Sequence, residues 1–200
     1  MENSMITIDE ITIVRDGREI IYDYSEQIPA GSITAIIGPN GCGKSTLLAA
    51  IAGDIAPDKG TITIDELHPI LTPPAQLAQI RAVSIQNQTY TLGFTVKQII
   101  EMAGSAEQVI QELELTALAD RQVTSLSGGE MQRVSIAAAI AQQTPVLLLD
   151  EPLSAQDVRS RKRIIELLQK LAENGVTVVV VVHSNESELS WADKVIKQLL

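Results

Sequence analysis

The chain has 200 residues and a mass of 21.6 kDa, enough for one ordinary domain with a sizeable core. Hydrophobic residues make up 45% of it and charged residues 20%, which excludes an intrinsically disordered chain. The formal net charge of −10 argues against a broad nucleic-acid-binding face, so we expect no nucleic-acid partner. A single cysteine excludes an internal disulfide framework and fits a reducing compartment.

No targeting or membrane-spanning pattern is found in the sequence. The first 13 residues carry Glu2, Asp9 and Glu10 and lack the apolar stretch of a signal peptide. The most apolar stretch, residues 176–182, is far too short to cross a bilayer. We therefore expect a soluble, cytoplasmic chain, and any membrane role must be peripheral.

Hydrophobic periodicity predicts strands and helices that alternate along the chain. The first half predicts, in order, three strands, a helix and two strands over residues 5–14, 19–24, 32–37, 46–52, 61–65 and 83–85. The second half predicts three helices, a strand, a helix and a strand over residues 96–103, 106–113, 130–142, 146–149, 158–173 and 176–182. Short apolar strands that alternate with helices are typical of an α/β fold with a mostly parallel sheet.

A phosphate-binding loop is the first chemical signal. Residues 38–45 fit the pattern G-x-x-x-x-G-K-[ST] between a predicted strand and a predicted helix. Its glycines let backbone N–H groups turn inward around an anion, and the helix N-terminus adds partial positive charge. We expect Lys44 to reach the β- and γ-phosphates and Ser45 to bind Mg²⁺. The predicted nucleotide-binding residues here are Gly38, Pro39, Asn40, Gly41, Cys42, Gly43, Lys44, Ser45 and Thr46. Cys42 is either a reactive thiol or a small residue at a tolerant position.

A second, acidic site is predicted where the apolar strand 146–149 ends in Asp150 and Glu151. If this strand lies next to the phosphate loop, Asp150 stands beside Ser45 and completes Mg²⁺ coordination. Because side chains alternate along a strand, Glu151 then points to the opposite side, where it can polarise an attacking water. An Asp-Glu pair after an apolar strand is common and indicates little by itself. Together with the upstream phosphate loop, it predicts a nucleotide site with a metal ligand and a base.

Residues 126–130 read Leu-Ser-Gly-Gly-Glu and are followed by Met-Gln-Arg. This segment resembles the signature motif of the ATP-binding cassettes of ABC transporters, and the resemblance covers nearly the whole chain. It implies a P-loop NTPase fold with a mostly parallel core sheet, an N-terminal antiparallel β subdomain and a small helical subdomain at about 87–142, within a single domain over 1–200. It also implies that Ser127, Gly128 and Gly129 complete the γ-phosphate site of a partner subunit in a head-to-tail dimer.

Three further positions match the family. Gln86 resembles the Q-loop glutamine, which senses Mg²⁺ and contacts the membrane subunit, with Gln88 as a competitor for that role. His183 matches the switch histidine that contacts the γ-phosphate. Residues 154–157 resemble the D-loop, with Gln156 where leucine is usual.

Arg15 departs from the family pattern. It stands where many members stack an aromatic ring on adenine. Its guanidinium can also stack on a π face, but an arginine on a strand can equally well face solvent. The sequence therefore predicts phosphate binding and leaves the adenine contact of Arg15 open.

The resemblance implies an ATPase that drives transport, with ATP and Mg²⁺ as its nucleotide and cofactor. The implied catalytic residues are Lys44, Glu151 and His183, and the implied metal-binding residues are Ser45, Gln86 and Asp150. The implied partners are a second cassette, identical or paired, integral membrane permease subunits on whose cytoplasmic side the chain would sit, and, for import, a substrate-binding protein.

The segments 81–86 and 93–96 resemble those of ATPases that serve importers of iron-siderophores, haem and cobalamin. An exporter with a detached cassette remains open. A soluble cassette acting on ribosomes or DNA is the alternative, but such relatives carry tandem cassettes or long coiled-coil insertions, which this chain lacks. A cassette that binds ATP without hydrolysing it is disfavoured because Asp150, Glu151, Ser127 and His183 are intact.

Overall fold

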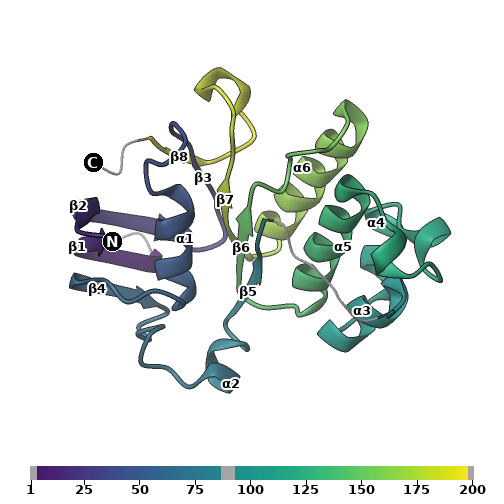
Figure 1. Ribbon diagram of the computed structural model, residues 1–200, viewed down its shortest axis with the longest axis horizontal. Coiled ribbons are helices and arrows are strands. Elements are labelled where there is room, and N and C mark those ends of the chain that lie inside the picture. Colours follow the sequence, from purple (N-terminus) through teal and green to yellow (C-terminus); the bar gives the residue numbers. More distant parts are fainter. Residues whose placement is uncertain (1–3, 87–92, 198–200) are drawn as a thin grey trace.

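The computed structural model describes residues 4–86 and 93–197, which form two sheets and the helices around them (Figure 1). A three-stranded antiparallel sheet has the order β2-β1-β4, with β1 (Ser4–Arg15), β2 (Arg18–Pro29) and β4 (Lys59–Ile64). A five-stranded parallel sheet has the order β5-β6-β7-β3-β8, with β3 (Ile33–Ile36), β5 (Arg81–Ser84), β6 (Val146–Asp150), β7 (Thr177–Val181) and β8 (Lys194–Ile196). The predicted α/β class with a mostly parallel core sheet is confirmed.

The helices cover both faces of the parallel sheet. They are α1 (Lys44–Ala52), α2 (Pro74–Leu77), α3 (Val96–Ala103), α4 (Glu107–Glu112), α5 (Gly128–Ala141) and α6 (Val158–Glu173), with 3₁₀ turns η1 (Thr116–Leu118), η2 (Val123–Ser125) and η3 (Glu186–Glu188). Helix α1 lies between the two sheets, α5 and α6 pack on the other face of the parallel sheet, and α3 and α4 lie at the far end of the molecule (Figure 1). The boundaries predicted for a helical subdomain remain a prediction.

Each central parallel strand serves two hydrophobic cores, which explains its unbroken apolar sequence. In β7, Val178 and Val180 face the core shared with α5 and α6, whereas Val179 and Val181 face the core shared with α1 and the antiparallel sheet. Both sets are fully buried. Both faces of the parallel sheet are therefore buried, each in a different core. The ends of its strands are the part of the sheet that remains accessible for chemistry.

A β-bulge explains the irregular apolar pattern of β1. Ile6, Ile8, Ile11 and Ile13 are all buried against one core, although strict alternation would put residues 8 and 11 on opposite faces. The pairing register shifts between Ile8 and Ile11, where Glu10 has a left-handed φ of 47°. One inserted residue thus returns the isoleucines to the same face.

Most predicted segments have an element in the structure, and the differences have local causes. Strand β2 continues through polar residues to Pro29, beyond the predicted end at residue 24, because pairing with β1 rather than apolar alternation defines it. The short elements α2 and β8 were not predicted, since four and three residues carry too little periodicity.

Gly60 faces the bulge, and we predict that Gly60→Ala is strongly destabilising. Its φ is +73°, and an added Cβ would lie 2.3 Å from the Asp9 carbonyl oxygen and 2.4 Å from that of Glu10. Gly17 has the same φ of +73° but open space around it, so Gly17→Ala is the matched control. In denaturant unfolding, we expect about 1 kcal/mol of lost stability for Gly17→Ala and at least about 3 kcal/mol for Gly60→Ala. Equal losses of stability in the two variants would contradict this prediction, because the bulge would then make room for the added Cβ without cost.

Candidate nucleotide-binding site

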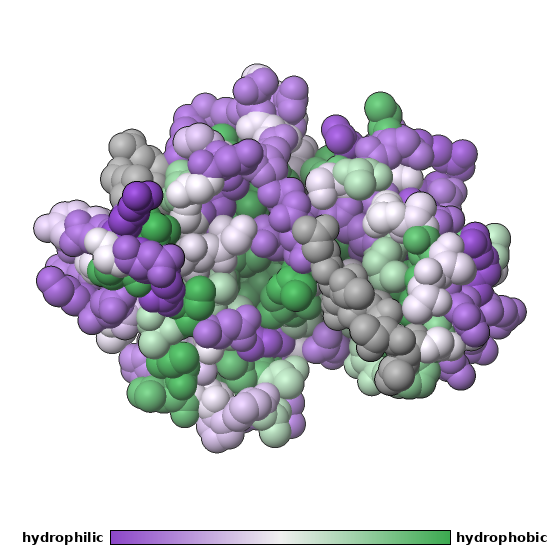
Figure 2. All heavy atoms as spheres, viewed as in Figure 1, coloured by the Kyte–Doolittle hydropathy of each residue, from purple (hydrophilic) through white to green (hydrophobic). Residues whose placement is uncertain are grey.

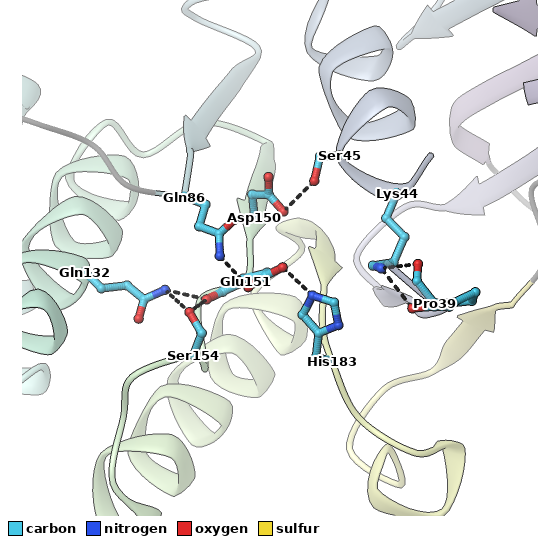
Figure 3. A network of polar contacts seen from close by, with 10 residues as sticks. Pro39, Lys44, Ser45, Gln86, Gln132, Asp150, Glu151, Ser154 and His183 are labelled. Atoms are coloured by element: carbon cyan, nitrogen blue, oxygen red, sulfur yellow. Dashed lines mark hydrogen bonds and ion pairs between the residues drawn. The ribbon is translucent and has the colours of Figure 1, made fainter. Parts of the chain in front are cut away.

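The predicted phosphate loop and the acidic residues meet at the carboxyl edge of the parallel sheet (Figure 3). Because parallel strands end at the same edge, the segments that follow β3, β5, β6 and β7 converge there. They surround a cleft of about 530 Å³. Its lining residues are Ile20, Asn40, Gly41, Gly43, Lys44, Ser45, Thr46, Gln86, Glu151 and His183.

The phosphate loop runs from the end of β3 into the first turn of α1. Gly43 precedes the helix with a φ of 98°, a left-handed conformation that favours glycine, and a Cβ there would lie in tight contact with Ile20 Cγ2 of β2, at 3.0 Å. The Lys44 ammonium is buried, with 6% of the residue exposed, and donates to the carbonyl oxygens of Gly38 at 2.8 Å and Pro39 at 3.0 Å. A buried cation whose described partners are only carbonyl dipoles is a favourable partner for an anion.

Ser45 and Asp150 are neighbours across the cleft. The Ser45 hydroxyl donates to Asp150 Oδ1 at 3.3 Å. Strand β7 separates β6 from β3 in the sheet, so the contact arises because the loop and α1 cross over the strand ends, not from pairing of the two strands. Burial raises the pKa of the Asp150 carboxyl above its usual range, and the Glu151 carboxylate acts in the same direction, while the Ser45 hydrogen bond opposes them.

Glu151 lies between Gln86 and His183 (Figure 3). Its Oε2 accepts a hydrogen bond from Gln86 Nε2 at 2.6 Å, and its Oε1 lies 2.5 Å from His183 Nε2. We expected side-chain alternation along the strand to turn the Glu151 carboxylate away from that of Asp150, and this reason is wrong. Strand β6 ends at Asp150, and Glu151 adopts a left-handed φ of 50°. The turn of the backbone at Glu151, rather than the pleat, separates the two carboxylates.

The signature-like segment forms the start of α5. Ser127 caps the helix in a capping box, since its hydroxyl accepts from Glu130 N at 3.4 Å and its own N–H donates to Glu130 Oε2 at 2.7 Å. The Ser127 hydroxyl also donates to Glu130 Oε2 at 2.7 Å. The two hydrogen bonds that the carboxylate accepts, from the Ser127 backbone N–H first and from its hydroxyl second, hold the pKa of the Glu130 carboxyl below its usual range. Ser127 and Gly128 are exposed, and neither they nor Gly129 are among the residues that line the cleft. The fold brings together the phosphate loop, Gln86, the Asp-Glu pair and His183 but leaves these three outside.

Arg15 is engaged away from the cleft. Its Nη1 donates to its neighbour's carbonyl, Val14 O, at 2.6 Å and lies 3.9 Å from Asp58 Oδ2. Ile20, which the sequence analysis missed, lines the cleft instead. No periodicity could reveal this, because the position of Ile20 depends on the contact between β2 and the phosphate loop.

Cys42 is half-buried, and a Cβ on Gly38 would lie 2.7 Å from its Sγ, so the thiol packs against the loop itself. Gln88, the competitor of Gln86, lies outside the described residues.

Comparisons with known proteins agree on one family. The family model described as "ABC transporter" matches residues 21–154. The hemin import ATP-binding protein HmuV of Rhodococcus jostii is 36% identical over 202 residues, covering 94% of this chain and 69% of that protein. The manganese transport system ATP-binding protein MntB of Listeria innocua is 34% identical over 205 residues, covering 96% of this chain and 85% of that protein.

The solved structures give the same result. A dimeric ATP-binding cassette in a post-hydrolysis state, bound to ADP and phosphate, is 27% identical and superposes with a TM-score of 0.82. The match covers 98% of this chain and 94% of that one. The fold is that of a P-loop cassette, its phosphate loop faces an Asp-Glu pair, and its relatives are named for ATP binding and transport. The chain therefore belongs to the ABC transporter family and is the ATP-binding and ATP-hydrolysing subunit of such a transporter.

Proposed function

We propose that the chain hydrolyses ATP in the cleft at the sheet edge and thereby drives import of haem or a related metal chelate. One observation supports the ATP hydrolysis in this proposal. The ammonium of Lys44, the hydroxyl–carboxylate pair of Ser45 and Asp150, and the carboxylate of Glu151 converge on one cleft. In this arrangement Lys44 and the loop N–H groups of residues 38–46 bind the triphosphate, and Ile20 packs beside the nucleoside.

Ser45 and Asp150 suit Mg²⁺, with Gln86 as a further oxygen donor. Hard oxygen donors are what this ion prefers, and it is usually held by one or two carboxylates together with substrate phosphates. The described residues contain no cluster of three or more His, Cys, Asp or Glu side chains that could hold a metal alone, which agrees with a shared site of that kind. When bound, the ion would neutralise charge on the phosphates.

Glu151 is the proposed general base. Its carboxylate is held on both sides, by Gln86 and by His183, and 13% of the side chain is exposed, so it is oriented yet reachable by water. It would accept the proton of the attacking water, while His183 contacts the γ-phosphate and keeps the carboxylate directed at that water. Lys44 stabilises the negative charge that remains on the phosphates.

A second copy completes the site. Ser127, Gly128 and Gly129 lie at an exposed helix N-terminus, which is a favourable surface for a phosphate group but is not in the chain's own cleft. In a head-to-tail dimer, this surface of one chain would close on the nucleotide of the other. Hydrolysis then reopens the pair.

The membrane partner would dock near Gln86 and α3. Within the described residues, no helix has both the length and the apolar character needed to cross a membrane. Ile85 and Met102 are 55% and 66% exposed, and on the face in Figure 2 hydrophobic residues gather in the hollow between the strands and the α3–α4 end. Permease subunits that contact this region would hold the chain on the cytoplasmic face of the membrane, with a substrate-binding protein on the other side.

We expect Glu151→Gln to abolish turnover and retain ATP binding. The amide keeps the size of the side chain but cannot accept the proton, so kcat should fall at least about 100-fold. Because ATP then persists, a dimer should accumulate in size-exclusion chromatography with Mg-ATP. Glu173→Gln, at the exposed end of α6, is the matched control and should behave as wild type. Turnover within a few-fold of wild type in Glu151→Gln would contradict the assignment.

Asp150→Asn should stabilise the nucleotide-free protein while abolishing turnover. Folding raises the pKa of Asp150, so the folded chain binds its proton more tightly than the unfolded chain does. The carboxyl therefore favours folding at low pH and opposes it once the pH exceeds the folded pKa. The site is half-buried, so we expect a gain of only about 2 °C in thermal midpoint at pH 7. The gain should shrink as the pH falls through the raised pKa; a gain that grows instead would refute the desolvation argument.

The cargo can be tested in the host. A strain without this chain should grow on inorganic iron but not on hemin as its sole iron source, and wild-type protein, unlike Glu151→Gln, should restore growth. Normal growth on hemin with a defect only at low manganese would contradict the proposal and favour a manganese system, as named for the Listeria relative.

A further inference from the structure

A chain of hydrogen bonds joins the start of α5 to the backbone of Glu151. Gln156, at the position where the D-loop of related cassettes has leucine, is 6% exposed and lies at its centre. Gln156 Nε2 donates to Gly129 O at 2.9 Å and to Gln132 Oε1 at 3.1 Å, and its Oε1 accepts from Arg133 Nη1 at 3.1 Å. All polar atoms of this buried amide are therefore used.

The chain continues through Gln132 to the proposed base. Gln132 Nε2 donates to the carbonyl oxygen of Glu151 and, at 3.0 Å, to Ser154 Oγ (Figure 3). The Ser154 hydroxyl donates to the same carbonyl at 2.9 Å. The Ser154 backbone N–H donates to this carbonyl as well, at 3.1 Å. Two side-chain donors and one backbone donor thus fix the backbone of Glu151 at the point where it adopts its left-handed conformation, which is unfavourable for a residue with a side chain.

The direction of every bond in this chain follows from Arg133. A guanidinium only donates, so the atom of Gln156 that faces Arg133 must be the oxygen. The Gln156 nitrogen is then left for Gly129 and Gln132, and the Gln132 nitrogen is left for Glu151 and Ser154. Reversing one amide would place two acceptors together at the next link.

The contact between the two segments is also close. Ala155 has a left-handed φ of 53°, and a Cβ on Gly129 would lie 2.6 Å from the Ala155 carbonyl oxygen. The loop that follows Glu151 therefore packs against the backbone of the α5 start, with no space for a side chain between them. Movement of one segment must displace the other.

We propose that Gln156 is a positioning residue for hydrolysis, which sets the direction of the Glu151 carboxylate through Gln132. It does not touch the nucleotide. Because Gly129 belongs to the surface offered to the second copy, the same amide ties that surface to the base of its own chain. The inference rests on the proposed role of Glu151 and is independent of the cargo.

Gln156→Glu tests the proposal with a side chain of nearly the same size. The carboxylate keeps a partner in Arg133 but cannot donate, so Gln132 loses the bond that holds its amide in place. We expect kcat to fall about tenfold while the KM for ATP stays within about twofold, because a misdirected base affects the reaction step and not binding. Gln169→Glu, an exposed change of the same kind on α6, should leave both constants unchanged.

A second variant separates positioning from general damage. Gln132→Met removes the last link and should lower kcat by a similar factor, and the double variant Gln132→Met/Gln156→Glu should be no slower than the slower single one, since both break one chain. Losses that multiply in the double variant, or a kcat within twofold of wild type in Gln156→Glu, would overturn the proposal. Glu151→Gln measured alongside distinguishes the two failures: if that variant still turns over, the role of Glu151 itself is wrong.

Discussion

A triphosphate can be held only where several positive and dipolar groups converge, and here a parallel sheet provides that convergence. Four strands end at one edge, and the segments after them carry the phosphate loop, Gln86, the Asp-Glu pair and His183. The sheet can do this because β3, β6 and β7 are apolar on both faces and are buried by two cores. The two cores that pack on the faces of the sheet therefore hold its carboxyl edge, where the site lies, in a fixed geometry.

The site also carries features that are unfavourable in the nucleotide-free chain. Lys44 is buried with carbonyl oxygens as its described partners, Asp150 is desolvated, and Glu151 is in a left-handed backbone conformation. Each costs stability in the nucleotide-free chain, as is common where binding and catalysis are prepared in advance. The start of α5 is the complementary case, because it is a helix N-terminus that lies outside the lining of the chain's own cleft. Both features agree with the proposed unit, which is complete only with nucleotide and a second copy.

Much of this was predictable from the sequence, for physical reasons. The phosphate loop, the apolar strands and helices α3 and α6 depend on local patterns, and their predicted ranges match the structure closely. The direction of Glu151 was predicted for the wrong reason, because a left-handed turn leaves no periodic signal. Ile20 and Gln132 were missed because their roles depend on contacts between distant segments, β2 with the loop and α5 with the chain after β6.

The central claim, that each site takes its base from one chain and its capping surface from another, is tested most directly by mixing two inactive variants. One is Glu151→Gln; the other is Ser127→Asp, which keeps a helix cap but opposes a phosphate with negative charge. Each alone should be inactive. Mixed in equal amounts, half of the dimers are heterodimers with one intact site, so turnover should return to about one quarter of the wild-type rate. A mixture as inactive as its components would contradict the shared site.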